Sequence, residues 1–229
     1  MLLSRLQFSS SLDYDGRHIL RGGMKGYFIT FEGIEGSGKT TQIKRLGRYL
    51  EAKGSSVLIT REPGGTKIGD KIRALLLDAH HSEMDAKTEL FLYLASRAQH
   101  VKEVIAPALA EGRIVLCDRF TEATLAYQGY GRRVPRHEID TLIGISCGTI
   151  QPHLTLLLDV EVGVGLGRLN RRGATDRLEQ EAVAFHEAVR QGYLRLARES
   201  PDRIHIIAAD GETNVVSKRI QEVVDGLLS

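Results

Sequence analysis

Short apolar runs recur along the chain and predict a series of buried strands. They read YFITFE (27–32), SVLITRE (56–62), RIVLCDR (113–119), HLTLLLDV (153–160) and RIHIIAA (203–209). Most of them are nearly continuous in apolar character instead of alternating. This pattern is typical of strands that are covered on both faces in a parallel sheet.

Between these runs, apolar residues recur at helical spacing. Helices are expected over 40–54, 66–82, 86–111, 140–150, 176–200 and 212–228. Gly54 ends the first of them and Pro107 lies near the end of the third. Strands that alternate with helices predict an α/β fold with helices on both faces of a parallel sheet. No repeat or linker divides the pattern, so residues 24–229 are expected to form a single domain.

The segment before Met24 differs from the rest of the chain. It has no continuous apolar stretch and contains Asp13 and Asp15, which argues against a signal or transit peptide. Met24 opens MKGYFITFEG, which reads as the start of the first strand. Residues 1–23 are therefore interpreted as a disordered extension or as the product of a misassigned upstream start, in preference to a functional arm.

Composition narrows the classes of function. Of the 229 residues 42% are hydrophobic and 26% are charged, and the net charge is only +2. These values are ordinary for a globular protein and do not call for a nucleic-acid or membrane partner. The apolar runs fall far short of the roughly 20 residues of a membrane-spanning helix. Cys117 and Cys147 lack CxxC spacing, which argues against a zinc site and fits a reducing cytoplasm.

The first strand is followed by a phosphate-binding motif. Residues 33–40, GIEGSGKT, satisfy G-x-x-x-x-G-K-[ST], with a strand before and a helix after. The glycines allow backbone N–H groups to surround a phosphate, and the helix adds its positive N-terminal end. Lys39 is expected to reach the β- and γ-phosphates, and the Thr40 hydroxyl to bind Mg²⁺. The motif indicates a nucleoside triphosphate but not its fate.

Charged pairs at two strand ends indicate a second anionic ligand. Asp118 closes the strand IVLCD in the manner of a Walker-B carboxylate, and Arg119 follows it. Arg61 and Glu62 end the neighbouring strand in the same way. Residues at the carboxyl ends of parallel strands face the crevice where ligands bind. A simple nucleotide switch has less need of these arginines.

Two more stretches add candidate side chains. Tyr93 and Arg97 lie four residues apart on one helix face, so a ring and a guanidinium project together. Taken alone they would be a core tyrosine and a surface arginine, but the other motifs favour a base-stacking ring and a phosphate donor. The second stretch, about 163–177, is rich in glycine and arginine and contains Arg168 and Arg172. It reads as a lid that closes over a triphosphate, with a solvated basic loop as the alternative.

Together these stretches resemble the thymidylate kinase family in its bacterial form, over essentially all of the chain from Met24 onward. The motifs that carry the resemblance are FEGIEGSGKTT, TREPGGT, LFLYLASRAQH, VLCDRFTEATLAYQGYGR and DRLEQE. The resemblance implies a P-loop NTPase-type, nucleoside monophosphate kinase-like α/β fold. It also implies transfer of the ATP γ-phosphoryl group to dTMP with Mg²⁺, for dTTP biosynthesis, by a cytoplasmic homodimer with small-molecule substrates.

The resemblance also assigns roles to individual positions. ATP would be bound by Gly33, Ile34, Glu35, Gly36, Ser37, Gly38, Lys39, Thr40 and Thr41. The phosphate of the acceptor dTMP would be bound by Arg97 and Arg119, with Arg61 nearby. Its deoxyribose would contact Glu35 at the 3′-hydroxyl and would lie against Tyr127. Its thymine would stack on Tyr93, and the base edge would be contacted by Arg73, Thr124 and Gln128. Asp118 and Glu62 would organise Mg²⁺ together with Thr40. Glu32 is interpreted as structural.

The family divides by the position of its catalytic arginine. One branch carries it in the P-loop, where this chain has Gly36 and Ser37. The lid must then supply the charge, with Arg172 as first choice and Arg168 as second, beside Lys39, Arg119 and Asp118 as catalytic residues. Three glycines at 163, 165 and 167 are expected to loosen the helix that leads to the lid.

Other functions stay open at this point. A kinase for another pyrimidine nucleoside monophosphate would use the same phosphate-binding arginines, whereas a deoxynucleoside kinase has less need of them. A guanine-nucleotide switch would need N-K-x-D, which the sequence lacks. A non-catalytic relative is disfavoured because every expected charged position is filled.

Overall fold

The computed structural model describes residues 26–170 and 176–228, although the side chain of Asn170 is not described. The interpretation of residues 1–23 and the assignment to Arg172 lie outside the described residues. Within the described part of the chain, no helix combines the length and apolar character needed to cross a membrane.

The described residues form one parallel sheet with strand order β2-β3-β1-β4-β5. Its strands are β1 (Phe28–Glu32), β2 (Val57–Arg61), β3 (Ile114–Asp118), β4 (Leu154–Asp159) and β5 (Ile204–Ala208). In the register, Phe31 pairs with Asp118 on one side and with Leu156 on the other. The carboxyl ends of β1, β2 and β3 therefore meet at one edge, as the parallel arrangement predicted.

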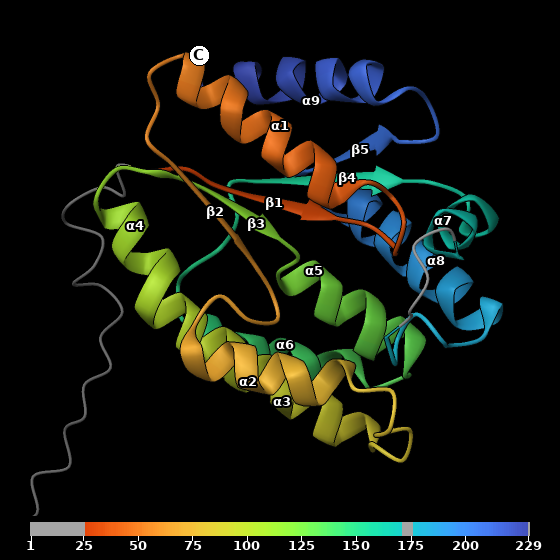
Figure 1. The fold of residues 1–229 in the computed structure, drawn as a ribbon. Helices are drawn as coiled ribbons and strands as arrows, with labels where there is room; N and C mark the ends of the chain where they lie inside the picture. Colours follow the sequence, from red (N-terminus) through yellow and green to blue (C-terminus); the bar gives the residue numbers. More distant parts are fainter. Residues whose placement is uncertain (1–25, 171–175, 229) are drawn as a thin grey trace, which may run out of the picture.

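Helices cover both faces of this sheet, as expected from the alternating pattern (Figure 1). They are α1 (Lys39–Ala52), α2 (Lys67–Leu77), α3 (Ala86–His100), α4 (Ala106–Ala110), α5 (Thr121–Thr124), α6 (Arg136–Cys147), α7 (Val162–Asn170), α8 (Val183–Glu199) and α9 (Thr213–Leu228). The π-helical segments η1 (Val101–Ile105) and η2 (Leu125–Gly131) connect α3 to α4 and extend α5. Helices α1 and α9 lie over one face, and α3, α5 and α8 lie on the other.

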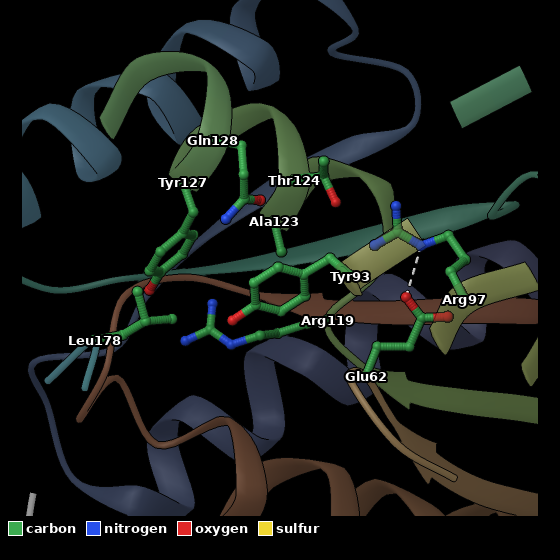
Figure 2. Close-up of a pocket in the computed structure, with 9 residues that line it drawn as sticks. All are labelled: Glu62, Tyr93, Arg97, Arg119, Ala123, Thr124, Tyr127, Gln128 and Leu178. Atoms are coloured by element: carbon green, nitrogen blue, oxygen red, sulfur yellow. Dashed lines mark hydrogen bonds and ion pairs between the residues drawn. The ribbon is translucent and has the colours of Figure 1, made fainter. Parts of the chain in front are cut away.

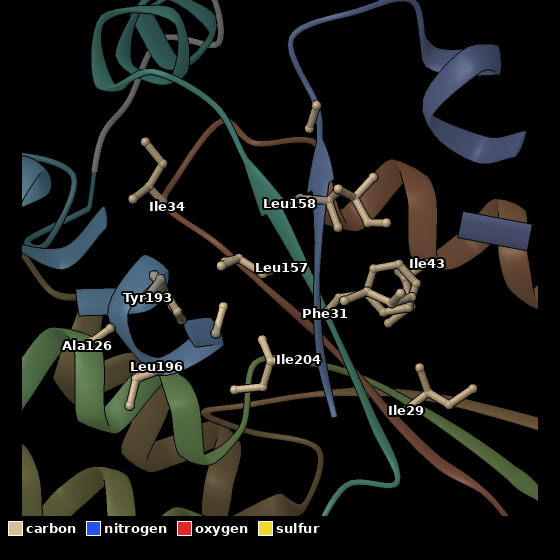
Figure 3. Packing of buried hydrophobic residues seen from close by; sticks show 14 of the residues in the cluster. Ile29, Phe31, Ile34, Ile43, Ala126, Leu157, Leu158, Tyr193, Leu196 and Ile204 are labelled. Atoms are coloured by element: carbon tan, nitrogen blue, oxygen red, sulfur yellow. The ribbon is translucent and has the colours of Figure 1, made fainter. Parts of the chain in front are cut away.

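The core fills the space on both sides of the central strands. Ile29 and Phe31 of β1 lie on the side of Ile43 from α1, whereas Leu157 of β4 is directed toward α8 (Figure 3). All four side chains are buried. Strands β1, β3 and β4 are covered on both faces, but the edge strands β2 and β5 are partly exposed. Burial on both faces, which the apolar runs predicted, therefore holds for the three inner strands but not for the two edge strands.

Several predicted helix boundaries were wrong for local reasons. The helix expected over 176–200 begins only at Val183, because the Asp176 carboxylate accepts the N–H groups of Leu178 and Glu179 and stabilises a turn. The helix expected over 66–82 ends at Leu77, where Asp78 adopts an extended conformation and bonds the N–H of His80.

Two further helices differ from the expectation. The helix predicted over 86–111 is continuous but widens to η1 before Pro107, since proline lacks an N–H and its ring crowds the preceding turn. The helix predicted over 140–150 spans 136–147 and ends before Gly148, which has φ +59°. The segment 121–131, for which no helix was predicted, is helical as α5 and η2.

Candidate active site

The P-loop connects β1 to α1 at the edge where the strands end. Gly38 precedes α1 in a left-handed conformation, and no side chain in the described residues caps this helix. A phosphate can therefore take the place of the cap. The Lys39 ammonium donates to the carbonyls of Gly33 (2.9 Å) and Ile34 (2.8 Å). Burial and the nearby Arg119 lower the pKa of Lys39 to about 8.

Thr40 and Asp118 meet beside the loop. The Thr40 hydroxyl donates to Asp118 Oδ2 over 3.2 Å, so the residue after the P-loop lysine and the end of β3 lie together. The described residues contain no cluster of three or more His, Cys, Asp or Glu that could hold a metal ion. One hydroxyl and one carboxylate still fit Mg²⁺, because this ion keeps several waters and also takes substrate phosphate oxygens as ligands.

Arg119 joins the P-loop to the second half of the site. Its backbone has φ 72°, and its guanidinium donates through Nη1 to Gly33 O (3.1 Å) and through Nη2 to Glu35 Oε1 (2.8 Å). The guanidinium carbon lies 4.8 Å from the centre of the Tyr127 ring. The same Nη1 also donates to Tyr193 Oη over 3.2 Å. The P-loop glutamate and the arginine after β3 therefore act as one unit.

The carboxylate of Glu35 points away from the loop backbone, toward α8 and η2. Tyr127 Oη donates to its Oε1 over 2.6 Å. Its Oε2 has no hydrogen-bond partner in the described part of the chain, although His186 Nδ1 lies 3.4 Å away. Burial opposes ionisation, but Arg119 and His186 outweigh it and hold the pKa of Glu35 well below its usual range. Glu35 is therefore a buried, ionised carboxylate whose Oε2 can accept a hydrogen bond from a ligand.

Glu32 forms a second buried carboxylate behind this unit. Its oxygens accept the Phe120 N–H (2.6 Å) and the Tyr193 hydroxyl (2.7 Å). Burial and the charge of Glu122 raise the pKa of Glu32 to about 7. Through Tyr193, Glu32 supports the position of Arg119, in keeping with the structural role expected from the sequence.

Arg97 lines a pocket beside β3 and is only 2% exposed, so the alternative of a solvated surface arginine is excluded. Its Nε donates to Glu62 Oε2 over 2.7 Å and its Nη2 donates to the carbonyl of Phe120 over 2.8 Å. Among the described residues its Nη1 has no hydrogen-bond partner. His100 contacts the other oxygen of Glu62 at 3.0 Å. The guanidinium of Arg97 is thus held in place through Nε and Nη2, and its Nη1 remains available to bind a ligand.

The pocket itself combines an aromatic ring, polar groups and cations. It is lined by Glu62, Tyr93, Arg97, Arg119, Ala123, Thr124, Tyr127, Gln128 and Leu178. Figure 2 shows the Tyr93 ring in the middle of these side chains, with Arg119 on one side and Arg97 on the other. The buried Thr124 hydroxyl lacks a hydrogen-bond partner in the described residues. A planar base with a phosphate matches this combination.

A larger cleft runs from this pocket to the P-loop. It is lined by Lys39 and Thr40 of the P-loop and by Arg73 and Tyr93, and Arg119 lines both this cleft and the pocket. Arg61 and Glu62 also line it, and Arg73 donates to the carbonyl of Pro63 over 3.0 Å. The cleft and the pocket are lined by most of the described residues that the sequence singled out, but not by Gly33, Ile34, Ser37, Gly38, Thr41 or Arg168. Glu62 contacts Arg97 and His100 through both oxygens, so its role at a metal stays a prediction.

Helix α7 packs directly on the P-loop through two glycines. A Cβ on Gly36 would lie 2.1 Å from the carbonyl oxygen of Gly165, and one on Gly165 would lie 2.6 Å from that of Glu35. Arg168 donates to the carbonyls of Gly36 (3.1 Å) and Ala209 (3.2 Å). Gly165 therefore permits close packing, which the sequence interpretation of loosening glycines missed. The same contact explains why position 36 has no room for an arginine.

Sequence reasoning missed four buried residues that support the site, namely Glu89, His100, His186 and Tyr193. His100 lies one turn after Arg97 in LASRAQH, and this spacing was a usable signal. His186 and Tyr193 lie two turns apart on α8 and were hidden in an apolar stripe. Glu89 has no sequence signal, because its partners come from distant parts of the chain.

A parallel sheet with a P-loop at the carboxyl end of its central strand, and a pocket lined by arginines beside that loop, is typical of P-loop nucleoside monophosphate kinase-like proteins. The family model described as Thymidylate kinase matches residues 31–220. A thymidylate kinase of Pelobacter propionicus is 55% identical over 201 residues, which are 85% of this chain and 92% of that protein. One of Geobacter sulfurreducens is 53% identical over 205 residues, 87% and 96% of the two chains.

A solved structure supports the same family. The crystal structure of thymidylate kinase from Ehrlichia chaffeensis superimposes with a TM-score of 0.72 and 35% identity, covering 87% of this chain and 98% of that one. The chain belongs to the thymidylate kinase family, and it is an enzyme of the kinase class. The family and the fold predicted from the sequence are confirmed.

Proposed function

We propose that this enzyme transfers the γ-phosphoryl group of ATP to dTMP, giving dTDP and ADP for dTTP biosynthesis. The observation that carries the proposal is the cleft in which the P-loop and the pocket with Tyr93 and Arg97 meet at Arg119. Relatives of more than 50% identity carry the name thymidylate kinase, which supports dTMP as the acceptor.

The donor half of the site takes the triphosphate of ATP. The expected loop residues are the nine from Gly33 to Thr41, with Lys39 as the cation that moves from loop carbonyls to phosphate oxygens. Thr40 and Asp118 would hold Mg²⁺, and their 3.2 Å contact supports this pairing. When bound, the ion supplies charge neutralisation at the β- and γ-phosphates.

The acceptor half takes a nucleoside monophosphate. The free Nη1 of Arg97 and the guanidinium of Arg119 would bind its phosphate. Tyr93 would stack on the base, while Arg73, Thr124 and Gln128 would contact the base edge. Glu35 would accept the 3′-hydroxyl, and Arg61 would lie near the phosphate. Tyr127 is held against Glu35 at 2.6 Å, where its ring would exclude a 2′-hydroxyl.

The chemistry is an in-line displacement. An acceptor phosphate oxygen attacks the γ-phosphorus, and the bond to the bridging oxygen breaks as ADP leaves. Because the attacking oxygen is already anionic, no general base is required. Lys39, Arg119 and a lid arginine would stabilise the charge, with Arg172 ahead of Arg168. Arg168 is engaged with Gly36 and Ala209 in this structure, which favours an anchoring role for it.

A homodimer in the cytoplasm completes the proposal. Phe91 on α3 is 56% exposed and Ile145 on α6 is 77% exposed, and these two helices pack against each other. Large apolar side chains exposed on adjacent helices favour a protein interface. Both cysteines are free and buried, in keeping with a reducing compartment.

An acceptor panel tests the proposed function. ADP release is measured with ATP and Mg²⁺ against dTMP, dUMP, UMP, CMP and thymidine. We expect dTMP to give the highest kcat/KM, thymidine to give none, and the ribonucleotides to be poor because of Tyr127. A higher kcat/KM for UMP or CMP would replace this function with the alternative, a kinase for another pyrimidine nucleoside monophosphate.

A further inference from the structure

A buried carboxylate lies directly behind the acceptor pocket. Glu89 of α3 has no exposed surface, and three side chains donate to it. Gln128 Nε2 donates to Oε1 over 2.8 Å. Arg132 donates to both oxygens at 3.2 and 3.1 Å, and Arg177 Nη2 donates to Oε2 over 2.6 Å. Only Gln128 of these residues also lines the pocket.

The chemistry of Glu89 fixes the orientation of the Gln128 amide. Burial opposes ionisation of Glu89, but its bonds to Arg132, Gln128 and Arg177 outweigh this and lower its pKa. An ionised carboxylate has no proton to donate, so it can face only the NH₂ end of an amide. The amide oxygen of Gln128 must then face elsewhere. In Figure 2 the amide lies above the Tyr93 ring, with its oxygen on the side of Ala123.

An amide oxygen beside a stacked base selects a ring N–H. Thymine and uracil carry a hydrogen on N3, whereas N3 of cytosine is an acceptor and would face the oxygen lone pairs. We propose that Glu89 is a positioning residue that determines base specificity. It holds the Gln128 amide so that the pocket accepts a pyrimidine with an N3–H and rejects cytosine. This inference rests on the proposed function and adds a specificity device to it.

The variant Glu89→Gln tests this inference. An amide at position 89 can donate or accept, so Gln128 is free to turn its NH₂ toward the base. We expect the ratio of kcat/KM for dTMP to that for dCMP to fall by about tenfold or more, through a loss for dTMP and a gain for dCMP. Thermal unfolding of each variant shows whether it is folded.

Glu181→Gln is the matched control. Glu181 Oε1 forms an ion pair with Arg132 at 2.6 Å, so this variant also removes a carboxylate from Arg132 but leaves the contact between Glu89 and Gln128. We expect its ratio to equal that of the wild type. Equal falls in both variants would overturn the proposal, since the effect would then come from Arg132.

Glu89→Asp provides the second variant in case Glu89→Gln does not fold. It keeps the negative charge for both arginines but shortens the reach to Gln128, so the same fall in the ratio is expected. An unchanged ratio in a folded and active Glu89 variant overturns the role of Glu89 alone. Failure of the wild type to phosphorylate dTMP would instead contradict the proposed function.

Discussion

Arg119 connects the two halves of the cleft at the scale of a single residue. Its left-handed backbone costs roughly 1–2 kcal/mol for a residue other than glycine, and hydrogen bonds of both Nη1 and Nη2 hold the side chain in place. The guanidinium holds Gly33, Glu35 and Tyr193 together. A change at any of these partners should therefore disturb both the donor and the acceptor side.

Lys39→Ala tests the donor side. Lys39 is the cation closest to the loop carbonyls and has no substitute in the P-loop itself. We expect turnover to fall on the order of 10³-fold, because a preorganised cation at the transferring phosphoryl group is lost. The exposed Lys53→Ala serves as the control. Near wild-type dTDP formation by Lys39→Ala would contradict the site assignment.

Glu32 predicts a pH-dependent stability. Its pKa is raised from 4.5 to about 7 in the folded state, so the stability it contributes is fully present below pH 4.5 and is lost as the pH rises through 7. The loss is on the order of 3 kcal/mol. We expect Glu32→Gln to remove this slope in urea unfolding between pH 5 and pH 8. The exposed Glu51→Gln variant is the control and should show the same pH dependence of unfolding free energy as the wild type. If the pH dependence of Glu32→Gln also ran parallel to that of the wild type, the prediction would be refuted.

At the scale of elements, helix α7 and the P-loop form one packed unit. Gly36 and Gly165 let the two backbones approach, and Arg168 fastens α7 to Gly36 and Ala209. Helix α7 lies within the stretch 163–177 that the sequence predicts as a lid, so its contact with the P-loop would fix where the predicted lid is attached. A small displacement of α7 should therefore change catalysis more than it changes the rest of the fold.

Gly165→Ala and Gly167→Ala form a matched pair for this contact. The new methyl at 165 would meet Glu35 O at 2.6 Å, whereas a Cβ at 167 meets nothing within 4 Å. We expect Gly165→Ala to destabilise by about 1–3 kcal/mol and to lower turnover. Gly167→Ala should be neutral or stabilise by up to about 1 kcal/mol. Thermal unfolding and kcat measure both, and equal effects would argue against the packed contact.

At the scale of the whole molecule, the exposed faces of α3 and α6 predict self-association. A charge at Ile145 (Ile145→Glu) should convert a dimer to a monomer in sedimentation velocity, because a buried unpaired carboxylate opposes the interface. Ile206→Glu, on the partly exposed edge strand β5, is the control and should leave the mass unchanged. A wild-type chain that sediments as a monomer would contradict the proposed homodimer.

The sequence was most informative where local chemistry dictates structure. The apolar runs located all five strands of the described sheet, and the P-loop pattern located the turn, because both depend on neighbouring residues only. Helix ends were predicted less well, since Asp78 and Asp176 bond nearby N–H groups in a way that periodicity does not reveal. Likewise, α5 and η2 lack a clear apolar period.

By itself, then, the sequence determined the α/β fold, the phosphate loop and the arginines at the strand ends. Only the tertiary structure decided what those side chains contact. Arg97 is buried and fixed because Glu62, the residue after β2, accepts its Nε hydrogen bond. The Gln128 amide is oriented because Glu89 of α3 accepts from its Nε2. The physical reason is that a buried charge or amide is oriented by partners far away in the chain, and residue spacing carries no record of such pairs.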